Sequence, residues 1–201
     1  MPPRLISIVK PLIIKDMKLI SLIAIIILIL SVGTLLGNIS LAETIQKIPE
    51  TPRGLALHFL KLDFEGARLS SDSYNKSGIG EFIAPGEYRS PGWDTVVLIN
   101  KYEIEKISQK SDQATVIVKY DVIGSLSNEL TIKRQKKRYT FRFKREGQRW
   151  FMIEPYDLAQ HISVSAAITH LEHLLVVQGD TEGTTKGLIE KLKQLDTRLN
   201  K

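Results

Sequence analysis

One stretch of alternating side chains, residues 114–122, constrains the fold of this chain most strongly. Every second position holds an apolar or aromatic residue: Ala114, Val116, Val118, Tyr120 and Val122. Most positions between them are polar, and a period of two is typical of a strand that buries one face. This stretch therefore predicts a half-buried β-strand.

Three similar runs surround that strand. Tyr102 and Ile104 alternate with charged residues before it, and the runs after it are Tyr139–Lys144 and Trp150–Ile153. Polar turns of only a few residues join them, and Pro155 ends the last run because proline donates no ladder hydrogen bond. Strands with such short connections pair as antiparallel neighbours. The region from Asp94 to Tyr156 is thus predicted to be a four-stranded antiparallel meander.

Helices are predicted on both sides of the meander. Thr51-Pro52 is a helix-start signal, and an apolar stripe that includes Phe59 follows it up to Gly66. After the meander, Ser163 and Gly179 bracket a second helix, and Thr184 or Thr185 opens a third. The leucine stripe of the third helix either packs on the domain or offers a partner surface. Residues 70–93 predict a loop with one or two short helical or extended pieces.

The N-terminal region has the pattern of an export signal. Leu19 to Leu36 carries no charge, lysines precede it, and the small residues Ser40 and Ala42 follow it. This predicts either a signal peptide cleaved after Ala42 or an uncleaved membrane anchor, with the true start at Met1 or Met17. Positive residues before the apolar run place the rest of the chain outside the cytoplasm. We therefore expect a bacterial protein of the periplasm or of the outer face of the cytoplasmic membrane.

The expected organisation follows from these segments. Residues 1–42 are the signal peptide or anchor, 43–50 a linker, 51–178 an α+β domain and 179–201 a C-terminal helix. The formal charge is +6, and residues 1–42 carry +3 of it. The remainder, about +3, is too small to imply a nucleic-acid partner. The chain has no cysteine, which excludes disulfides and thiolate zinc sites.

The sequence contains no recognisable catalytic or metal-binding motif. His170 and His173 lie one helical turn apart, but no third ligand is evident, so a solvated helix edge is the favoured interpretation. No Gly-x-Ser-x-Gly elbow is present. We accordingly predict no catalytic, cofactor-binding or metal-ligating residues from the motifs.

Basic residues crowd the stretch from Thr131 to Trp150. They are a solvated loop and outer strand face, or they contact anionic lipid headgroups or an acidic envelope protein. The candidates for an anionic surface are Lys133, Arg134, Lys136, Lys137, Arg138, Arg142 and Lys144.

The pattern as a whole resembles a known superfamily. A helix of the type Thr51-Pro52…Phe59-Leu60…Gly66-Ala67 precedes the antiparallel sheet, and the last hairpin ends in Gly147…Trp150-Phe151-Met152-Ile153. Over about residues 51–156 this resembles the nuclear transport factor 2-like (cystatin-like) superfamily. That resemblance implies an α+β cone, in which a curved sheet wraps around the first helix. Proteins of this shape include enzymes, periplasmic lipid carriers and a secretion-system assembly component.

The resemblance also suggests where a ligand would bind. A cone cavity would be lined by inward-facing side chains, with these candidates: Tyr102, Tyr120, Tyr139, Trp150 and Glu154. Three functions stay open: a non-catalytic binding or assembly module of the cell envelope, which we favour; a carrier of a lipid or other apolar ligand; and a small-molecule isomerase or hydrolase-type enzyme. The oligomeric state is not predicted.

Overall fold

The structure is a computed structural model that describes residues 50–85, 94–155, 158–180 and 183–200. Ile48–Lys201 forms a compact unit. The predicted export segment, residues 1–42, and most of the linker lie outside the described residues. No helix among the residues described has the length and apolar character needed to cross a membrane.

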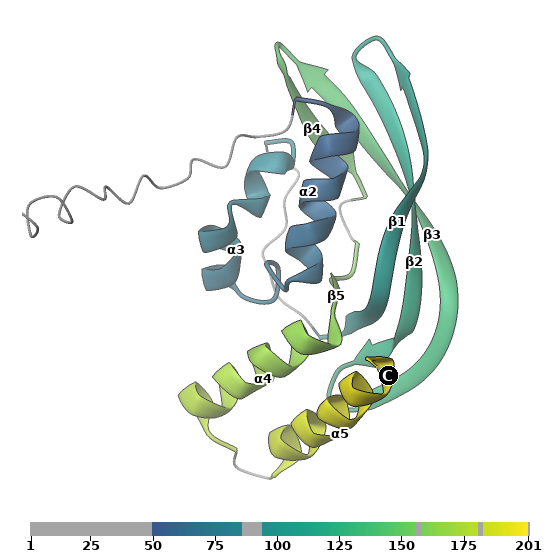
Figure 1. Ribbon diagram of the computed structural model, residues 1–201. Helices are drawn as coiled ribbons and strands as arrows, with labels where there is room; N and C mark the ends of the chain where they lie inside the picture. The colour runs from purple at the N-terminus through teal and green to yellow at the C-terminus, as the bar shows by residue number, and fades with distance from the viewer. Residues whose placement is uncertain (1–49, 86–93, 156–157, 181–182, 201) are drawn as a thin grey trace, which may run out of the picture. The chain divides into compact units, whose positions relative to one another are not determined.

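The unit is an α+β fold built on a strongly curled sheet (Figure 1). Four long or medium strands follow one another along the chain: β1 (Val96–Lys110), β2 (Gln113–Leu126), β3 (Leu130–Glu146) and β4 (Arg149–Glu154). Each pairs antiparallel with the next, which confirms the predicted meander.

The sheet has a fifth strand that the sequence did not predict. β5 (His161–Ile162) pairs parallel with β1, so the strand order is β4-β3-β2-β1-β5 and the sheet is mixed. The expectation of a purely antiparallel four-stranded sheet was therefore incomplete. Two residues are too few to show the period of two from which the other strands were recognised.

The strands are also longer than predicted. β3 begins at Leu130, so the basic run from Lys133 to Arg138 lies inside the strand and not in a loop. The turn that precedes it is short, with Ser127 N donating to the Glu129 carbonyl oxygen at 3.1 Å. Charged residues can occupy a long strand whose outer face meets solvent, which explains why hydrophobicity alone missed this part.

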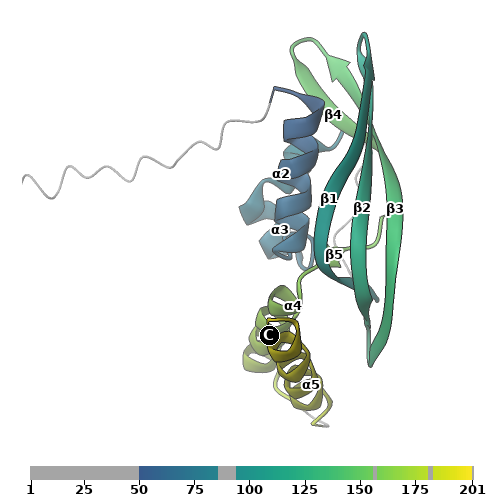
Figure 2. The same ribbon diagram turned by 45° about the vertical axis from the view of Figure 1, so that its right-hand side comes forward.

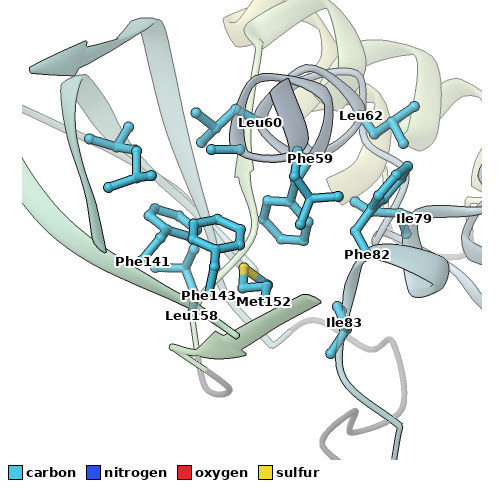
Figure 3. Packing of buried hydrophobic residues seen from close by; sticks show 14 of the residues in the cluster. Phe59, Leu60, Leu62, Ile79, Phe82, Ile83, Phe141, Phe143, Met152 and Leu158 are labelled. Carbon is cyan, nitrogen blue, oxygen red and sulfur yellow. The ribbon is translucent and has the colours of Figure 1, made fainter. Parts of the chain in front are cut away.

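Helix α2 (Pro52–Phe64) fills the concave face of the sheet (Figure 2). Thr51 caps it as predicted, since Gly54 N donates to Thr51 Oγ1 at 3.1 Å. Its apolar stripe packs against β2, β3 and β4. The rings of Phe59 and Phe141 pack edge to face, with 6.0 Å between the ring centroids (Figure 3). Leu55, Phe59 and Leu60 are each at most 2% exposed, so the helix and the sheet share one dry core.

Two short helices follow α2. They are α3 (Ser71–Ser77) and the 3₁₀-helix η1 (Ile79–Phe82), which occupy part of the stretch predicted to hold short pieces. Ser70 and Ser73 form a reciprocal capping box at the start of α3. Ile79 and Phe82 are buried and extend the core beneath α2 (Figure 3). The rest of that stretch, residues 86–93, lies outside the described residues.

Helices α4 (Val164–Gln178) and α5 (Thr184–Leu199) make a second core at the other end of the sheet (Figure 1). Ser163 caps α4 as predicted, with Ala166 N donating to Ser163 Oγ at 3.0 Å. The leucine stripe of α5 is buried, and Leu192 is 0% exposed. Of the two alternatives for this helix, it therefore packs on the domain.

Candidate functional site

Strand alternation distributes the predicted site residues over the two faces of the curled sheet. Tyr120 is completely buried on the concave face, while Tyr102 and Tyr139 are half-buried on that face. Lys137 pairs with Tyr120 across β2 and β3, so its side chain shares the concave face. The basic run is therefore not one surface: Lys137 lies on the concave face of the curled sheet, whereas its neighbours Lys136 and Arg138 lie on the convex face.

A buried ion pair joins the end of α2 to the segment that leads into β5. Arg68 donates to both carboxylate oxygens of Asp63, from Nε and from Nη2, each at 2.8 Å. Arg68 also donates to the carbonyl oxygens of Leu158, at 2.8 Å, and Ala159, at 3.2 Å. Asp63 is 1% exposed and Arg68 is 8% exposed. This arrangement of charge and hydrogen bonds fixes the backbone around residue 160.

The same carboxylate positions His161. The His161 backbone N–H donates to Asp63 Oδ2 at 3.1 Å, and His161 Nδ1 lies 2.7 Å from the Ala159 carbonyl oxygen. A carbonyl oxygen can only accept, so Nδ1 carries the proton and Nε2 is a bare acceptor. Burial lowers the pKa of His161, which keeps the ring neutral, although Asp63 opposes that shift.

His161 lies in an aromatic group with two tyrosines of the concave face. Its ring centroid is 4.3 Å from that of Tyr120 and 5.0 Å from that of Tyr139, and the two tyrosine rings meet edge to face at 5.6 Å. Burial raises the pKa of Tyr120, so its hydroxyl stays protonated. Neither Tyr120 Oη nor His161 Nε2 has a hydrogen-bond partner among the described residues. We name Asp63, Arg68, Tyr120 and His161 the concave cluster.

The other two cavity candidates lie apart from this cluster. Trp150 is 4% exposed and packs in the hydrophobic core. Glu154 pairs with Arg142, whereas Phe143 pairs with Met152, so an extra residue, Ile153, shifts the register between these pairs. The shift turns Glu154 to the convex face, where its carboxylate lies 3.2 Å from Arg142 Nε. Strict alternation from Trp150 had placed Glu154 with the inward-facing residues.

On the convex face, carboxylates of β1, β3 and β4 neutralise part of the basic run. Arg138 of β3 forms a two-pronged ion pair with Glu105 of β1, at 2.6 and 2.8 Å. Arg142 pairs with Glu154, and Lys144 pairs with Glu146 at 3.2 Å. The hydrogen bond from Arg138 lowers the pKa of Glu105. Exposed pairs of this kind add little stability, but they reduce the positive field of the strand.

Three cations near the start of β3 have no such partner. Among the described residues, no carboxylate lies within 4.0 Å of Lys133, Arg134 or Lys136. Lys136 borders a small surface pocket beside Asp121, while Lys133 and Arg134 are exposed. Ile132, which precedes them in β3, is 50% exposed and is one of four exposed large apolar side chains among the described residues, with Leu57, Val176 and Val177. We name Ile132, Lys133, Arg134 and Lys136 the hairpin cluster.

The two histidines of α4 line an open groove between α3 and α4. The groove has a volume of about 620 Å³, and Asp72, Lys76, His170 and His173 are among the residues that line it. Burial lowers the pKa of His170. No group of three histidine or carboxylate side chains in the described part of the chain is placed to hold a metal ion.

Sequence reasoning missed three of the four members of the concave cluster. Asp63 falls within the helical stripe region, Arg68 follows the helix, and His161 lies in a two-residue strand. One acidic residue, Asp63, and one basic residue, Arg68, lie near the end of an otherwise apolar helix. Their proximity in sequence was only a weak signal that this end of the helix is buried. No local pattern pointed to His161.

The chain matches no protein-family model, no curated protein and no solved structure.

Proposed function

We propose that this chain is a non-catalytic binding module of the cell envelope, and that the hairpin cluster contacts an anionic lipid surface. The observation that carries the proposal is that three cations without a carboxylate partner among the described residues and the half-exposed Ile132 are neighbours along the first part of β3. Cations attract anionic headgroups, and an apolar side chain beside them can enter the interface. An acidic protein would use the cations but gain less from Ile132.

The packing of the concave face supports a module in preference to a lipid carrier. A carrier needs an apolar cavity large enough to enclose most of its ligand. Here α2 occupies the hollow of the sheet, and its apolar side chains pack directly on those of β2, β3 and β4. The same packing favours the nuclear transport factor 2-like cone as the parent architecture, with β5 and the α4–α5 pair as additions.

Vesicle sedimentation tests the lipid contact. The fragment 48–201 is used, since the apolar segment before it would itself bind lipid, and circular dichroism first checks its folding. Vesicles with about 30 mol% phosphatidylglycerol, which gives their surface a strong negative charge, are compared with purely zwitterionic vesicles. We expect binding to the anionic vesicles that weakens as salt is raised, because salt screens exposed charges.

A charge-matched pair of variants locates the surface. The triple change Lys133→Gln, Arg134→Gln and Lys136→Gln removes three charges at about 1 kcal/mol each, so binding should weaken about a hundredfold. The control removes the same charge from exposed residues at the opposite end of the sheet: Lys110→Gln, Arg145→Gln and Arg149→Gln. That end is about 25 Å away along the strands, well beyond the screening length.

The two variants give opposed outcomes. If both weaken binding equally, net charge and not the hairpin cluster drives the contact. If the fragment does not bind anionic vesicles but does bind acidic proteins of the envelope, the proposed lipid contact is wrong.

The envelope location has its own test. The chain has no cysteine, so a single Asn128→Cys in the exposed β2–β3 turn reports the side of the membrane. We expect a membrane-impermeant maleimide to label this cysteine in intact cells. Labelling only after lysis would place the domain in the cytoplasm.

A further inference from the structure

Strand β3 is much longer than the strand that pairs with its outer edge. β3 has 17 residues and β4 has 6, and their ladder runs only from the Arg142–Glu154 pair to the Glu146–Arg149 pair. On its other side, β3 pairs with β2 along nearly its whole length. The outer edge of β3 from Leu130 to Phe141 therefore has no neighbouring strand among the described residues.

The backbone groups on this outer edge are free to bond to another chain. In an antiparallel ladder, every second residue directs both its N–H and its C=O to the same side. No other backbone segment among the described residues bonds to the groups that point away from β2 over this stretch. In both ribbon views, no described element lies along this side of β3 (Figures 1 and 2). Such an edge is a template on which a further strand can form.

One part of this edge has the regular geometry that a further strand needs. The register between β2 and β3 shifts by one residue at Lys133-Arg134, and it is regular from Gln135 to Phe141. A bulge twists the strand and interrupts pairing, so the part before Gln135 is a poor template. We name residues 135–141, a stretch roughly 20 Å long, the open edge.

The charge of the open edge selects its occupant. It contains Lys136, Lys137 and Arg138, and of these only Arg138 has a carboxylate within 4.0 Å among the described residues. Lys136 and Lys137 lie on opposite faces of the sheet, so an added strand would meet a positive charge on both faces. Two copies of this edge would repel each other, because lysines on an edge oppose pairing with a second basic strand. The outer edge of β1 mixes both signs from Lys101 to Lys106 and shows no such preference.

We propose that the open edge binds an extended acidic segment of a protein partner, which adds to the sheet as a strand beside β3 and in line with β4. Main-chain hydrogen bonds to alternate residues of β3 supply affinity, and carboxylates opposite Lys136 and Lys137 supply specificity. The open edge shares Lys136 with the hairpin cluster. It does not depend on the proposed lipid contact, because lipid headgroups cannot continue a backbone ladder.

Amide hydrogen exchange tests the added strand directly. The probe is a synthetic peptide built of Val-Glu-Glu-Thr repeats, whose adjacent glutamates point to opposite faces of a strand. Full-length ¹⁵N-labelled protein in an uncharged detergent is measured with and without the peptide. The open-edge amides that point away from β2 should exchange rapidly in the free protein. With the peptide bound, we expect them to exchange at least about tenfold more slowly.

Two control peptides and a lipid control separate backbone pairing from charge. The same peptide with every backbone nitrogen methylated keeps its charge but has no N–H donor, so it should bind at least about tenfold more weakly. A peptide with lysine in place of each glutamate keeps the donors but should not bind. Vesicles rich in phosphatidylglycerol should leave exchange of the open-edge amides unchanged, even where they bind the hairpin cluster.

Two charge-matched double variants locate the contact. Lys136→Gln with Lys137→Gln should weaken peptide binding about tenfold, because each removes one ion pair with the added strand. Lys110→Gln with Arg145→Gln removes the same charge from exposed residues about 25 Å away along the strands and should leave affinity within about twofold. Circular dichroism checks that both variants fold.

Three results would overturn the proposal. Equal affinity for the methylated and unmethylated peptides would mean that charge alone holds the peptide. Equal loss in the two double variants would place the contact away from the open edge. Open-edge amides that are already protected in the free protein, with protection that increases with protein concentration, would mean that a second copy of the chain occupies the edge.

Discussion

The buried ion pair of the concave cluster allows a quantitative prediction for Asp63→Asn. The asparagine keeps the size of the side chain but removes its negative charge, which leaves the Arg68 guanidinium buried without its counter-ion. Asp63 accepts two bonds from Arg68 and one from the His161 backbone. An amide has one oxygen, so at least one of these donors also loses its acceptor.

The expected loss is large because both partners are nearly inaccessible to solvent, with side-chain exposures of 1% and 10%. Removing one partner of a buried ion pair typically costs about 3–5 kcal/mol of unfolding free energy. For a domain of about 150 residues, this corresponds to a melting temperature lower by about 6–20 °C. Urea unfolding of fragment 48–201, followed by circular dichroism, measures the change.

A control and a double variant make the prediction specific. Asp72→Asn breaks the exposed Asp72–Lys76 pair, also 2.8 Å long, and should leave stability unchanged within error. Asp63→Asn combined with Arg68→Met should cost less than the two single changes added together, because no unpaired charge remains. A loss below about 1 kcal/mol for Asp63→Asn would refute the reasoning, since it would make the pair equivalent to a surface one.

Two further predictions concern pH and backbone packing. Burial lowers the pKa of His161 in the folded state, so the unfolded chain binds a proton more readily than the folded one. The contribution of neutral His161 to the unfolding free energy is therefore fully present above about pH 6.5, and it is lost as the pH falls toward the lower pKa of the folded state. Urea midpoints at pH 7.5 and 5.5 should therefore differ less in His161→Gln than in the parent, and an unchanged difference would assign the effect to other groups. Gly124→Ala should destabilise the domain by about 1–3 kcal/mol, because the new methyl group would overlap the Thr131 carbonyl oxygen on the neighbouring strand. Thermal unfolding measures this loss, and the exposed Gly187→Ala, which meets no neighbour, is the control.

The convex face illustrates how a linear charge count overstates a binding surface. The sequence presented seven basic candidates between Lys133 and Lys144 as one anionic-surface patch. The structure turns Lys137 inward and brings Glu105, which is 33 residues away from Arg138 in sequence, into contact with that arginine. Only part of the run therefore lacks a carboxylate partner in the part of the chain that the structure describes, and the neighbouring Ile132 gave no signal in the sequence.

The sequence by itself determined the elements that depend on local periodicity and capping. The alternation around Val118 specified a half-buried strand, and Thr51 and Ser163 marked two helix starts. Each of these features needs only neighbours within a few residues, so it can be read from the chain directly.

Only the tertiary structure decided the features that join distant parts of the chain. The Asp63 carboxylate binds the backbone of a residue 98 positions away, and a one-residue bulge moves Glu154 to the opposite face of the sheet. The parallel strand β5 is too short to have a period. Contacts of this kind arise from burial and long-range packing, which local sequence does not encode, and they determine where the concave cluster forms.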